Sequence, residues 1–286
     1  MNDKTIQAAH LPIGKLRSFA GNPFQVRNDD EMEQLIFSIL SQGVLTPVMV
    51  RPLENDEYEV ISGHRRVHAC KKAGIAEVPA LIYCLDRDEA AIALVDSNLH
   101  REHILPSEKA FAYKMKLEAM NRRGQRTDLT SSQVATKLDT AAEIGKSQGE
   151  SRDKVYRYIR LTYLIPEILT KVDNGEIAMS PAVEISYLTD AEQSTLLDAM
   201  EQNDCTPSHA QAIRMKKLSQ QGQLGDNVIY TIMEEEKPNQ KEQIRLRRED
   251  FRKYFPPGYP EAKIKQDIEK ALELLMRQRQ RSRDAR

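Results

Sequence analysis

The sequence predicts two folded parts of different class: an α/β domain over residues 1–105, followed by an all-helical domain over residues 106–222. Short runs of β-forming residues fall in the first hundred residues, at Pro47–Pro52, Tyr58–Ser62 and Val78–Leu85. From Pro106 onward, apolar residues recur at helical spacing between polar segments. Residues 223–286 are predicted to form a linker and a C-terminal helical segment.

The α/β part also contains three predicted helices. The first covers residues 29–42, because apolar residues recur with helical period from Met32 to Leu40 and Gly43 follows as a stop. The second runs from Arg65 to Ala73 and ends at Gly74. The third covers residues 86–100, with Asp86 or Asp88 near its N-cap.

In the helical part, Pro106 is expected to begin a long helix that stops at Gly124. Several shorter helices follow, and a looser polar stretch is expected over residues 222–240.

Charge is distributed unevenly along the chain. The formal net charge is −1, but residues 101–171 carry 14 Lys/Arg against 9 Asp/Glu, and residues 241–286 carry 14 against 8. Such segregation points to regional anionic partners. The three cysteines lack CxxC spacing, so a disulfide framework and a cysteine zinc site are not expected, and a cytoplasmic location fits. No apolar run reaches the ~18 residues needed to cross a bilayer, so no membrane partner is expected.

Residues 140–161 match a helix-turn-helix. Gly145 supplies the small residue where two helices would meet, Gly149 suits the turn, and Val155 and Ile159 suit the inner face of the second helix. We therefore expect that helix to enter the DNA major groove. The predicted DNA contacts are Ser151, Arg152, Lys154, Tyr156, Arg157 and Arg160. Glu150 and Asp153 would repel phosphates if they faced DNA. The alternative is an ordinary helical hairpin with a solvated basic face.

The stretch Gly63-His64-Arg65-Arg66 stands where a predicted strand becomes a helix. A glycine at this junction leaves backbone N–H groups at the helix N-terminus, where the helix dipole favours an anion. Arginine adds forked donors suited to phosphate oxygens. The motif alone is also compatible with a basic surface turn.

Two further stretches extend this pattern: Asn22–Arg27 (NPFQVR) and Ser97–Glu102 (SNLHRE). The order NPxQxR, GxRR, NxxRE and helix-turn-helix over residues 10–190 resembles the ParB/RepB/Noc family of DNA-partition proteins, and its insertion pattern resembles the plasmid and mobile-element branch. The resemblance implies a sulfiredoxin-like N-terminal fold that binds CTP with Mg²⁺. It also implies phosphate contacts from Gly63, His64, Arg65, Arg66, Asn98 and Arg101, with Asn98 near the metal. Gln25, Arg27 and Thr46 would surround the base and sugar.

The resemblance further implies a homodimeric clamp on a centromere-like double-stranded DNA site, with a Walker-type partition ATPase as partner. We therefore predict a cytoplasmic, DNA-associated protein of plasmid or chromosome segregation. Two positions depart from the family pattern. Ser97 stands where many members have Glu, which makes slow CTP hydrolysis doubtful, and His64 stands where Glu is commoner; a protonated His64 would add charge.

Several alternatives remain open from the sequence. The main rival is a nucleotide-independent helix-turn-helix transcription regulator of a mobile element. A structural metal site at His64 and His68, sulfiredoxin-type redox chemistry and nuclease activity are weaker readings, because partner cysteines or clustered carboxylates are missing. The stripe Ile264, Ile268, Leu272 and Leu275 is expected to support self-association, and the basic tail after it to contact DNA without sequence preference.

Overall fold

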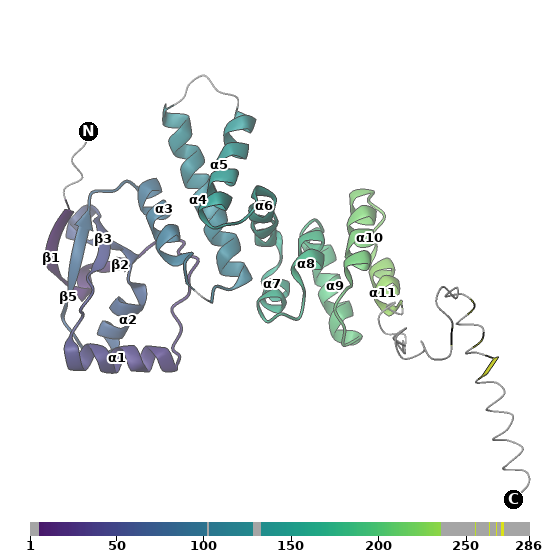
Figure 1. The fold of residues 1–286 in the computed structure, drawn as a ribbon, viewed down its shortest axis with the longest axis horizontal. Helices are drawn as coiled ribbons and strands as arrows, with labels where there is room; N and C mark the ends of the chain where they lie inside the picture. The colour runs from purple at the N-terminus through teal and green to yellow at the C-terminus, as the bar shows by residue number, and fades with distance from the viewer. Residues whose placement is uncertain are drawn as a thin grey trace, which may run out of the picture. The chain divides into compact units, whose positions relative to one another are not determined.

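Figure 1 shows the fold of the protein as a computed structural model. The structure describes residues 6–101, 103–127 and 133–235, with side chains omitted over 124–139, and isolated positions at 255, 263, 267, 270 and 271. The chain divides into two compact units, Met1–Glu235 and Glu236–Arg286. In the second unit, Lys263, Asp267, Lys270 and Ala271 are helical. The predicted self-association stripe at 264–275 and the basic tail lie outside the described residues.

The N-terminal part is built on a five-stranded mixed sheet in the order β1-β5-β3-β4-β2. Its strands are β1 (Ile6–Pro12), β2 (Leu16–Ser18), β3 (Val48–Pro52), β4 (Tyr58–Ser62) and β5 (Glu77–Tyr83). β1 pairs antiparallel with β5 and β3 with β4, whereas β3–β5 and β2–β4 are parallel. The three predicted strands are present. The sequence missed β1 and β2, because β1 is an edge strand that buries only Leu11 and β2 is three residues long.

Three helices accompany this sheet: α1 (Asp30–Gln42), α2 (His64–Lys72) and α3 (Arg87–Asn98). Asp29 caps α1 by accepting a hydrogen bond from the Met32 N–H at 2.9 Å, and Gly43 ends it with φ 73°. Two short 3₁₀ turns occupy Ile13–Lys15 and Glu54–Asp56. Val48, Val50 and Val60 from the sheet are buried with Cys70 of α2. They form the core against which α1 and α2 pack.

The second part is all-helical, as predicted. Its helices are α4 (Pro106–Thr127), α5 (Gln133–Ser147), α6 (Arg152–Arg160), α7 (Pro166–Asp173), α8 (Met179–Ile185), α9 (Asp190–Gln202), α10 (His209–Gln220) and α11 (Asp226–Glu234), with a 3₁₀ turn at Leu161–Tyr163. α4 continues three residues past Gly124, so that glycine is not its stop.

The polar stretch expected to be a linker differs from the prediction. Asp226–Glu234 forms α11, whose Ile229, Ile232 and Met233 are buried. These residues join the core of α7–α10, so tertiary burial outweighs the polar composition of the surrounding segment.

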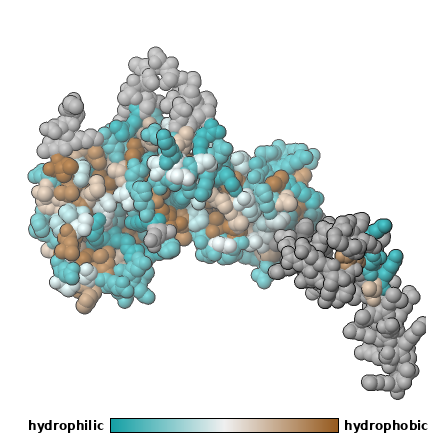
Figure 2. Space-filling view, viewed as in Figure 1, coloured by the Kyte–Doolittle hydropathy of each residue, from teal (hydrophilic) through white to brown (hydrophobic). Residues whose placement is uncertain are grey.

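The surface differs between the two parts. On the face drawn in Figure 2, hydrophobic residues gather over the sheet and around α1. Phe37 and Leu40 of α1 are exposed by 74% and 62%. Among the described residues, no helix combines the length and the apolarity required to span a membrane.

Candidate functional site

The junction between β4 and α2 has the geometry of an anion-binding turn. Gly63 is the N-cap of α2 and has φ 100°, and no side chain caps the helix there. A Cβ on Gly63 would lie 2.8 Å from Val48 Cγ1, so only glycine fits at this close approach. The first intrahelical bond is donated by the Val67 N–H to the Gly63 carbonyl at 3.0 Å. The amide groups of the first turn therefore offer an uncapped N-terminus with a favourable dipole.

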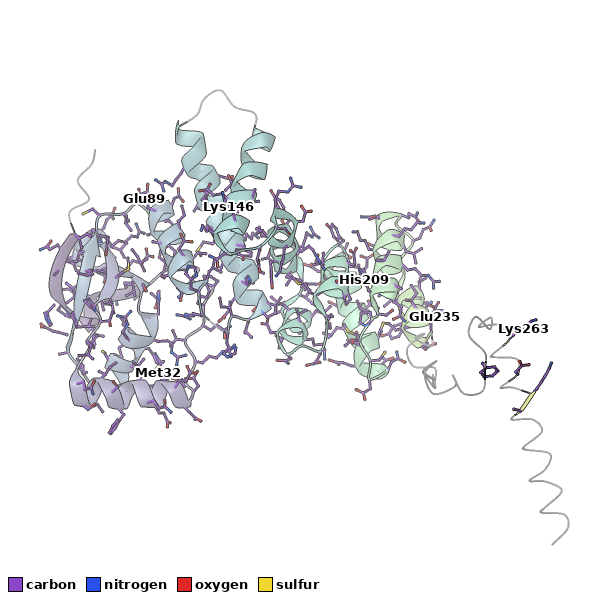
Figure 3. All side chains as sticks on the ribbon, viewed as in Figure 1. Met32, Glu89, Lys146, His209, Glu235 and Lys263 are labelled. Carbon is purple, nitrogen blue, oxygen red and sulfur yellow. The ribbon has the colours of Figure 1, made fainter. Side chains whose placement is uncertain are left out.

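Arg65 extends from this first turn toward the beginning of α1. Its Nη2 donates to Asp29 Oδ1 at 3.0 Å and to Glu31 Oε2 at 3.2 Å. Met32, labelled in Figure 3, lies in the first turn of α1, which follows the cap residue Asp29. Desolvation opposes ionisation of Asp29, but the Met32 N–H and the charge of Arg65 outweigh it and lower the pKa of Asp29. Sequence analysis did not single out Asp29 or Glu31, although both lie within four residues of the end of the NPFQVR motif.

A pocket of about 480 Å³ lies beside Arg65. Residues 22–27, which we call the strap, also contribute to its lining. Three arginines line it: Arg27 of the strap, Arg65, and Arg101 after α3. The guanidinium of Arg101 lies 5.6 Å from the centre of the Phe24 ring. Desolvation and the nearby charge of Arg65 both lower the pKa of Arg101, and Glu108 opposes this. Cations held this close favour a polyanionic ligand.

The structure thus brings together Gln25, Arg27, Arg65 and Arg101, four of the residues predicted to bind the nucleotide. The rest of the lining consists of Asp29, Glu31, His103, Ile104, Leu105, Pro106, Glu108 and Asp173. Glu108 is the third residue of α4, a position where glutamate is favoured at a helix start. That preference is the sequence signal that could have pointed to Glu108.

Arg66 does not line this pocket, although it is adjacent to Arg65. Its Nη1 donates to the Pro47 carbonyl at 2.7 Å and also to the Thr46 carbonyl. Burial lowers its pKa. Arg66 therefore braces the turn before β3, and Thr46 contributes its backbone oxygen to that brace instead of to the pocket.

His64 does not line this pocket but lines a small second cavity with Val26 and His68. Its Nε2 is buried and has no hydrogen-bond partner within the described residues. Burial, reinforced by the charge of Arg101, lowers the pKa of His64 to about 4, against the weaker effects of Glu59 and the Val60 carbonyl. His64 is therefore neutral at pH 7 in the ligand-free protein.

Asn98 is also placed away from the pocket. It is 4% exposed, and its Nδ2 donates to the Leu94 carbonyl at 2.7 Å and to Ser97 Oγ at 3.2 Å. The Ser97 hydroxyl in turn donates to the Leu94 carbonyl at 2.9 Å. Both side chains are therefore engaged with the end of their own helix.

The pocket does not supply a resident magnesium site. Each of its four carboxylates already accepts hydrogen bonds: Asp29 and Glu31 from Arg65, Glu108 from backbone N–H groups, and Asp173 from Ser107. Across the part of the chain that the structure describes, no group of three His, Cys, Asp or Glu side chains is placed to hold a metal ion. The residues present therefore do not fit a Mg²⁺ ion held by protein ligands alone.

The helix-turn-helix is formed by α5 and α6, as its spacing predicted. A Cβ on Gly145 would lie 2.6 Å from the Glu150 carbonyl oxygen, and Gly149 has φ 66°. Ser151 caps α6 by accepting from the Lys154 N–H at 3.2 Å, and Val155 is fully buried. Both glycines are therefore required by close approach or by backbone conformation, which is why the pattern was readable from the sequence.

Glu150 does not face solvent, so its expected repulsion of phosphates does not arise there. Its side chain is 9% exposed and receives Lys109 Nζ at 2.7 Å, Tyr113 Oη at 2.8 Å and Lys154 Nζ at 2.9 Å. Burial opposes ionisation, but the bonds from Lys109, Lys154 and Tyr113 outweigh it and lower the pKa of Glu150. Asp153 is 78% exposed and pairs with Arg152 at 3.1 Å.

The predicted DNA-contacting residues differ in their surroundings. Ser151, Arg152, Lys154 and Arg157 are exposed, and Tyr156 is half-buried. Arg157 donates to Ser180 Oγ at 2.8 Å. Arg160 is held inside the helical part: its Nε donates to Ser186 Oγ at 3.1 Å, and its guanidinium lies 3.8 Å from the Tyr187 ring centre and 4.4 Å from that of Tyr163. These contacts support a packing role for Arg160.

Comparison with known proteins identifies the family. The family model described as the ParB N-terminal domain matches residues 2–99. The chromosome-partitioning protein Spo0J of Thermus thermophilus is 31% identical over 205 residues, which are 71% of this chain and 69% of that protein. The nucleoid occlusion protein of Listeria innocua is 33% identical over 195 residues, which are 68% of this chain but less than two thirds (62%) of that protein.

A solved structure of C-terminally truncated ParB from Caulobacter crescentus, complexed with CTP-gamma-S, is 26% identical with a TM-score of 0.32 and covers 64% of this chain and 94% of that one. A C-terminally truncated ParB from the same organism, complexed to the centromeric parS site, is 22% identical with a TM-score of 0.42 and covers 79% of this chain and 98% of that one. The chain contains NPFQVR, GHRR and SNLHRE in this order, and it matches the Thermus thermophilus protein over more than two thirds of either chain. The chain therefore belongs to the ParB family of partition proteins.

Proposed function

We propose that this protein is a site-specific DNA-binding partition protein whose N-terminal pocket binds CTP, acting in segregation of a plasmid or mobile element. The observation that carries the proposal is the convergence of Arg27, Arg65 and Arg101 on one pocket; Arg65 comes from the first turn of α2, whose N-terminus has no side-chain cap. Arginine forks and free amide groups are the donors that a triphosphate requires.

In this proposal, Arg65 and Arg101 bind the phosphates, and Gln25 and Arg27 of the strap border the nucleoside. Arg66 acts indirectly, by bracing the turn at 46–47. Any Mg²⁺ would arrive with the phosphates, because the carboxylates of the pocket are already bonded. The proposal concerns binding and includes no hydrolytic step.

The DNA-binding half of the proposal rests on α6. Its exposed residues Arg152, Lys154 and Arg157 lie on one helix whose inner face is closed by Val155. Lys154 is paired with Glu150 and Arg152 with Asp153, so DNA phosphates would have to compete with these carboxylates. Dimerisation, a clamp around centromere-like DNA and a Walker-type ATPase partner complete the proposal as expectations from the family resemblance.

Calorimetry tests the nucleotide half. Full-length protein is titrated with CTP, ATP, GTP and UTP in the presence of Mg²⁺. The same titrations are then repeated with the Arg65→Ala variant. We expect CTP-selective binding that weakens by about thirtyfold in Arg65→Ala, since a charge-assisted hydrogen bond contributes about 2 kcal/mol. Arg87→Ala removes an exposed arginine outside the pocket and should leave the affinity unchanged. Absence of binding by every nucleotide would favour the nucleotide-independent regulator.

A further inference from the structure

A row of alternating cations and aromatic rings crosses the surface of the helical part. We call this row the ladder, and its members in order are Lys114, Tyr163, Arg160, Tyr187 and Lys216. Lys114 Nζ lies 5.3 Å from the ring centre of Tyr163, and Arg160 Cζ lies 4.4 Å from the same centre. Arg160 Cζ and Lys216 Nζ both lie 3.8 Å from the ring centre of Tyr187. Side chains from α4, α6, α10 and two turns therefore build one surface, and of its members only Arg160 was predicted to bind DNA.

The ladder is exposed, and apolar side chains border it. Tyr163 and Tyr187 are 53% and 41% exposed. Phe111 and Ile213, each three residues before a lysine of the ladder on the same helix, are 42% and 46% exposed. Residues three apart lie on the same side of a helix. Ile213 belongs to α10, which begins at His209, labelled in Figure 3. Aromatic side chains and arginine are the residues in which protein–protein interfaces are enriched.

The charge of the ladder favours an acidic protein partner. Arg160 and Lys216 cover opposite faces of the Tyr187 ring, because two cations 3.8 Å from one ring centre would collide on the same face. That ring therefore offers no face for the base stacking by which single-stranded nucleic acid binds. Across the described ranges, Glu184, at 2.8 Å from Lys216, is the one carboxylate that pairs with a ladder cation. A phosphate backbone would satisfy the remaining charge but would give the bordering apolar side chains nothing to pack against.

The outward stripe of α1 has the complementary composition. Asp30, Glu33, Phe37 and Leu40 recur at helical spacing, with the two acids before the two apolar residues. Phe37 and Leu40 are 74% and 62% exposed, and Leu45, just beyond the helix, is 76% exposed. Both acids are exposed, and no cation in the described part of the chain pairs with either of them. Nothing in the chain itself therefore covers this stripe.

We propose that the outward stripe of α1 on one copy of this chain docks on the ladder of a second copy. The acids of α1 pair with the ladder cations, and Phe37 and Leu40 pack against the tyrosines and the apolar border. The two surfaces carry opposite charge, both are rimmed by exposed apolar side chains, and neither covers the other within one chain. Because the surfaces differ, the contact is heterologous and links copies into chains unless two copies close on each other. The contact requires neither nucleotide nor DNA, so it is independent of the proposed function.

Sedimentation velocity on the full-length protein, without DNA or nucleotide, tests this contact. The weight-average sedimentation coefficient of the wild type should rise between about 1 and about 100 μM, the range in which a weak protein contact forms. Glu33→Lys should weaken this association by about tenfold, because it places like charges opposite each other. Lys114→Glu should weaken it equally from the other surface. The double variant exchanges the two charges, so its association should return to within about twofold of wild type.

Matched controls change the same charges elsewhere. Glu54→Lys and Lys146→Glu alter exposed residues outside both surfaces and should associate as the wild type does. Phe37→Ser leaves every charge in place and should weaken association by about tenfold, because it removes an apolar anchor. Phe37 is 74% exposed, so this substitution keeps the fold and decides the question even if Lys114→Glu does not fold.

Three results overturn the proposal. The first is a wild-type sedimentation coefficient that does not change with concentration. The second is association that stays at the wild-type level in Glu33→Lys or in Phe37→Ser, which would assign self-association to another part of the chain, or a folded double variant as weak as the single variants. The third is a Lys114→Glu protein that associates normally but binds a DNA duplex more weakly, which would make the ladder a DNA contact.

Discussion

Arg65 Nη2 lies 3.0 Å from Asp29 Oδ1, so an arginine at the N-terminus of α2 is paired with the residue that caps α1. Glu31 adds a second carboxylate at 3.2 Å. These internal anions occupy donors that a phosphate would use. An incoming polyanion must therefore displace them, and Asp29 sets part of the cost of binding.

Replacing Asp29 with asparagine should tighten nucleotide binding. Asparagine caps helices as well as aspartate does, so α1 should keep its start while Arg65 loses a charged competitor. Because the pair is partly exposed, we expect an effect of about threefold in the CTP dissociation constant measured by calorimetry. Asp30→Asn removes a neighbouring exposed charge and should have little effect. Weaker binding in Asp29→Asn would mean that Asp29 orients Arg65 for the ligand instead of competing with it.

His64 should make the protein less stable as the pH falls from 7 to 5. The unfolded histidine takes up a proton near pH 6.5, whereas burial holds the folded pKa at about 4, so protonation favours the unfolded state between these values. The expected loss is about 2 kcal/mol of unfolding free energy over this range, measured by urea denaturation. His64→Gln should show a flatter profile. Asp29 affects stability only at lower pH, because its pKa is lowered in the folded protein from an ordinary value of 3.8. Equal profiles in both proteins would show that His64 is not desolvated.

The predictable features of this chain are those set by local chemistry. The helix-turn-helix was readable because Gly145 and Gly149 meet demands of close contact and positive φ that few other residues can satisfy. The glycine at position 63 was readable for the same reason, whereas its predicted contact with phosphate stays a prediction. The different fates of Arg65 and Arg66 were not, because both have the same chemistry and only the fold decides that one faces Asp29 and the other the Pro47 carbonyl.

Longer-range relationships also escaped prediction. Glu108 and Gln25 are 83 residues apart, and no local pattern announces their hydrogen bond. Arg160 looked like its exposed neighbour Arg157 in the sequence, yet it contacts Ser186, which lies 26 residues further along the chain, and the adjacent Tyr187. Tertiary contacts of this kind have no signature in the sequence around either partner.

Gly63→Ala should destabilise the protein and disable the pocket. The new methyl group would lie 2.8 Å from Val48 Cγ1, at a residue whose φ of 100° is strained for any side chain. Together these effects should lower the unfolding free energy by about 2–4 kcal/mol in urea denaturation. Gly14→Ala is the matched control, since its Cβ would meet nothing within 4 Å, and it should change stability by less than about 0.5 kcal/mol. A Gly63→Ala protein as stable as Gly14→Ala would contradict the tight packing of this turn.

Alanine substitutions at Arg157 and Arg160 should affect different properties: the first should weaken DNA binding, and the second should lower the stability of the fold. Arg157 is exposed and donates a hydrogen bond to Ser180, so Arg157→Ala should leave the unfolding free energy within about 0.5 kcal/mol of wild type. Its loss should weaken binding to a labelled DNA duplex and reduce the slope of log affinity against log salt by about 1, as expected for one lost phosphate contact.

Arg160→Ala should show the opposite pattern. Loss of the bonds to Ser186 and of the stacking between Tyr163 and Tyr187 should lower the unfolding free energy by about 1–3 kcal/mol. The salt slope, measured by fluorescence anisotropy at temperatures where the variant is folded, should stay at the wild-type value. A slope reduced as much in Arg160→Ala as in Arg157→Ala would place Arg160 at the DNA backbone after all. The aromatic contacts would then serve to orient its guanidinium toward phosphate, because a guanidinium that contacts ring faces keeps its charge available to another partner.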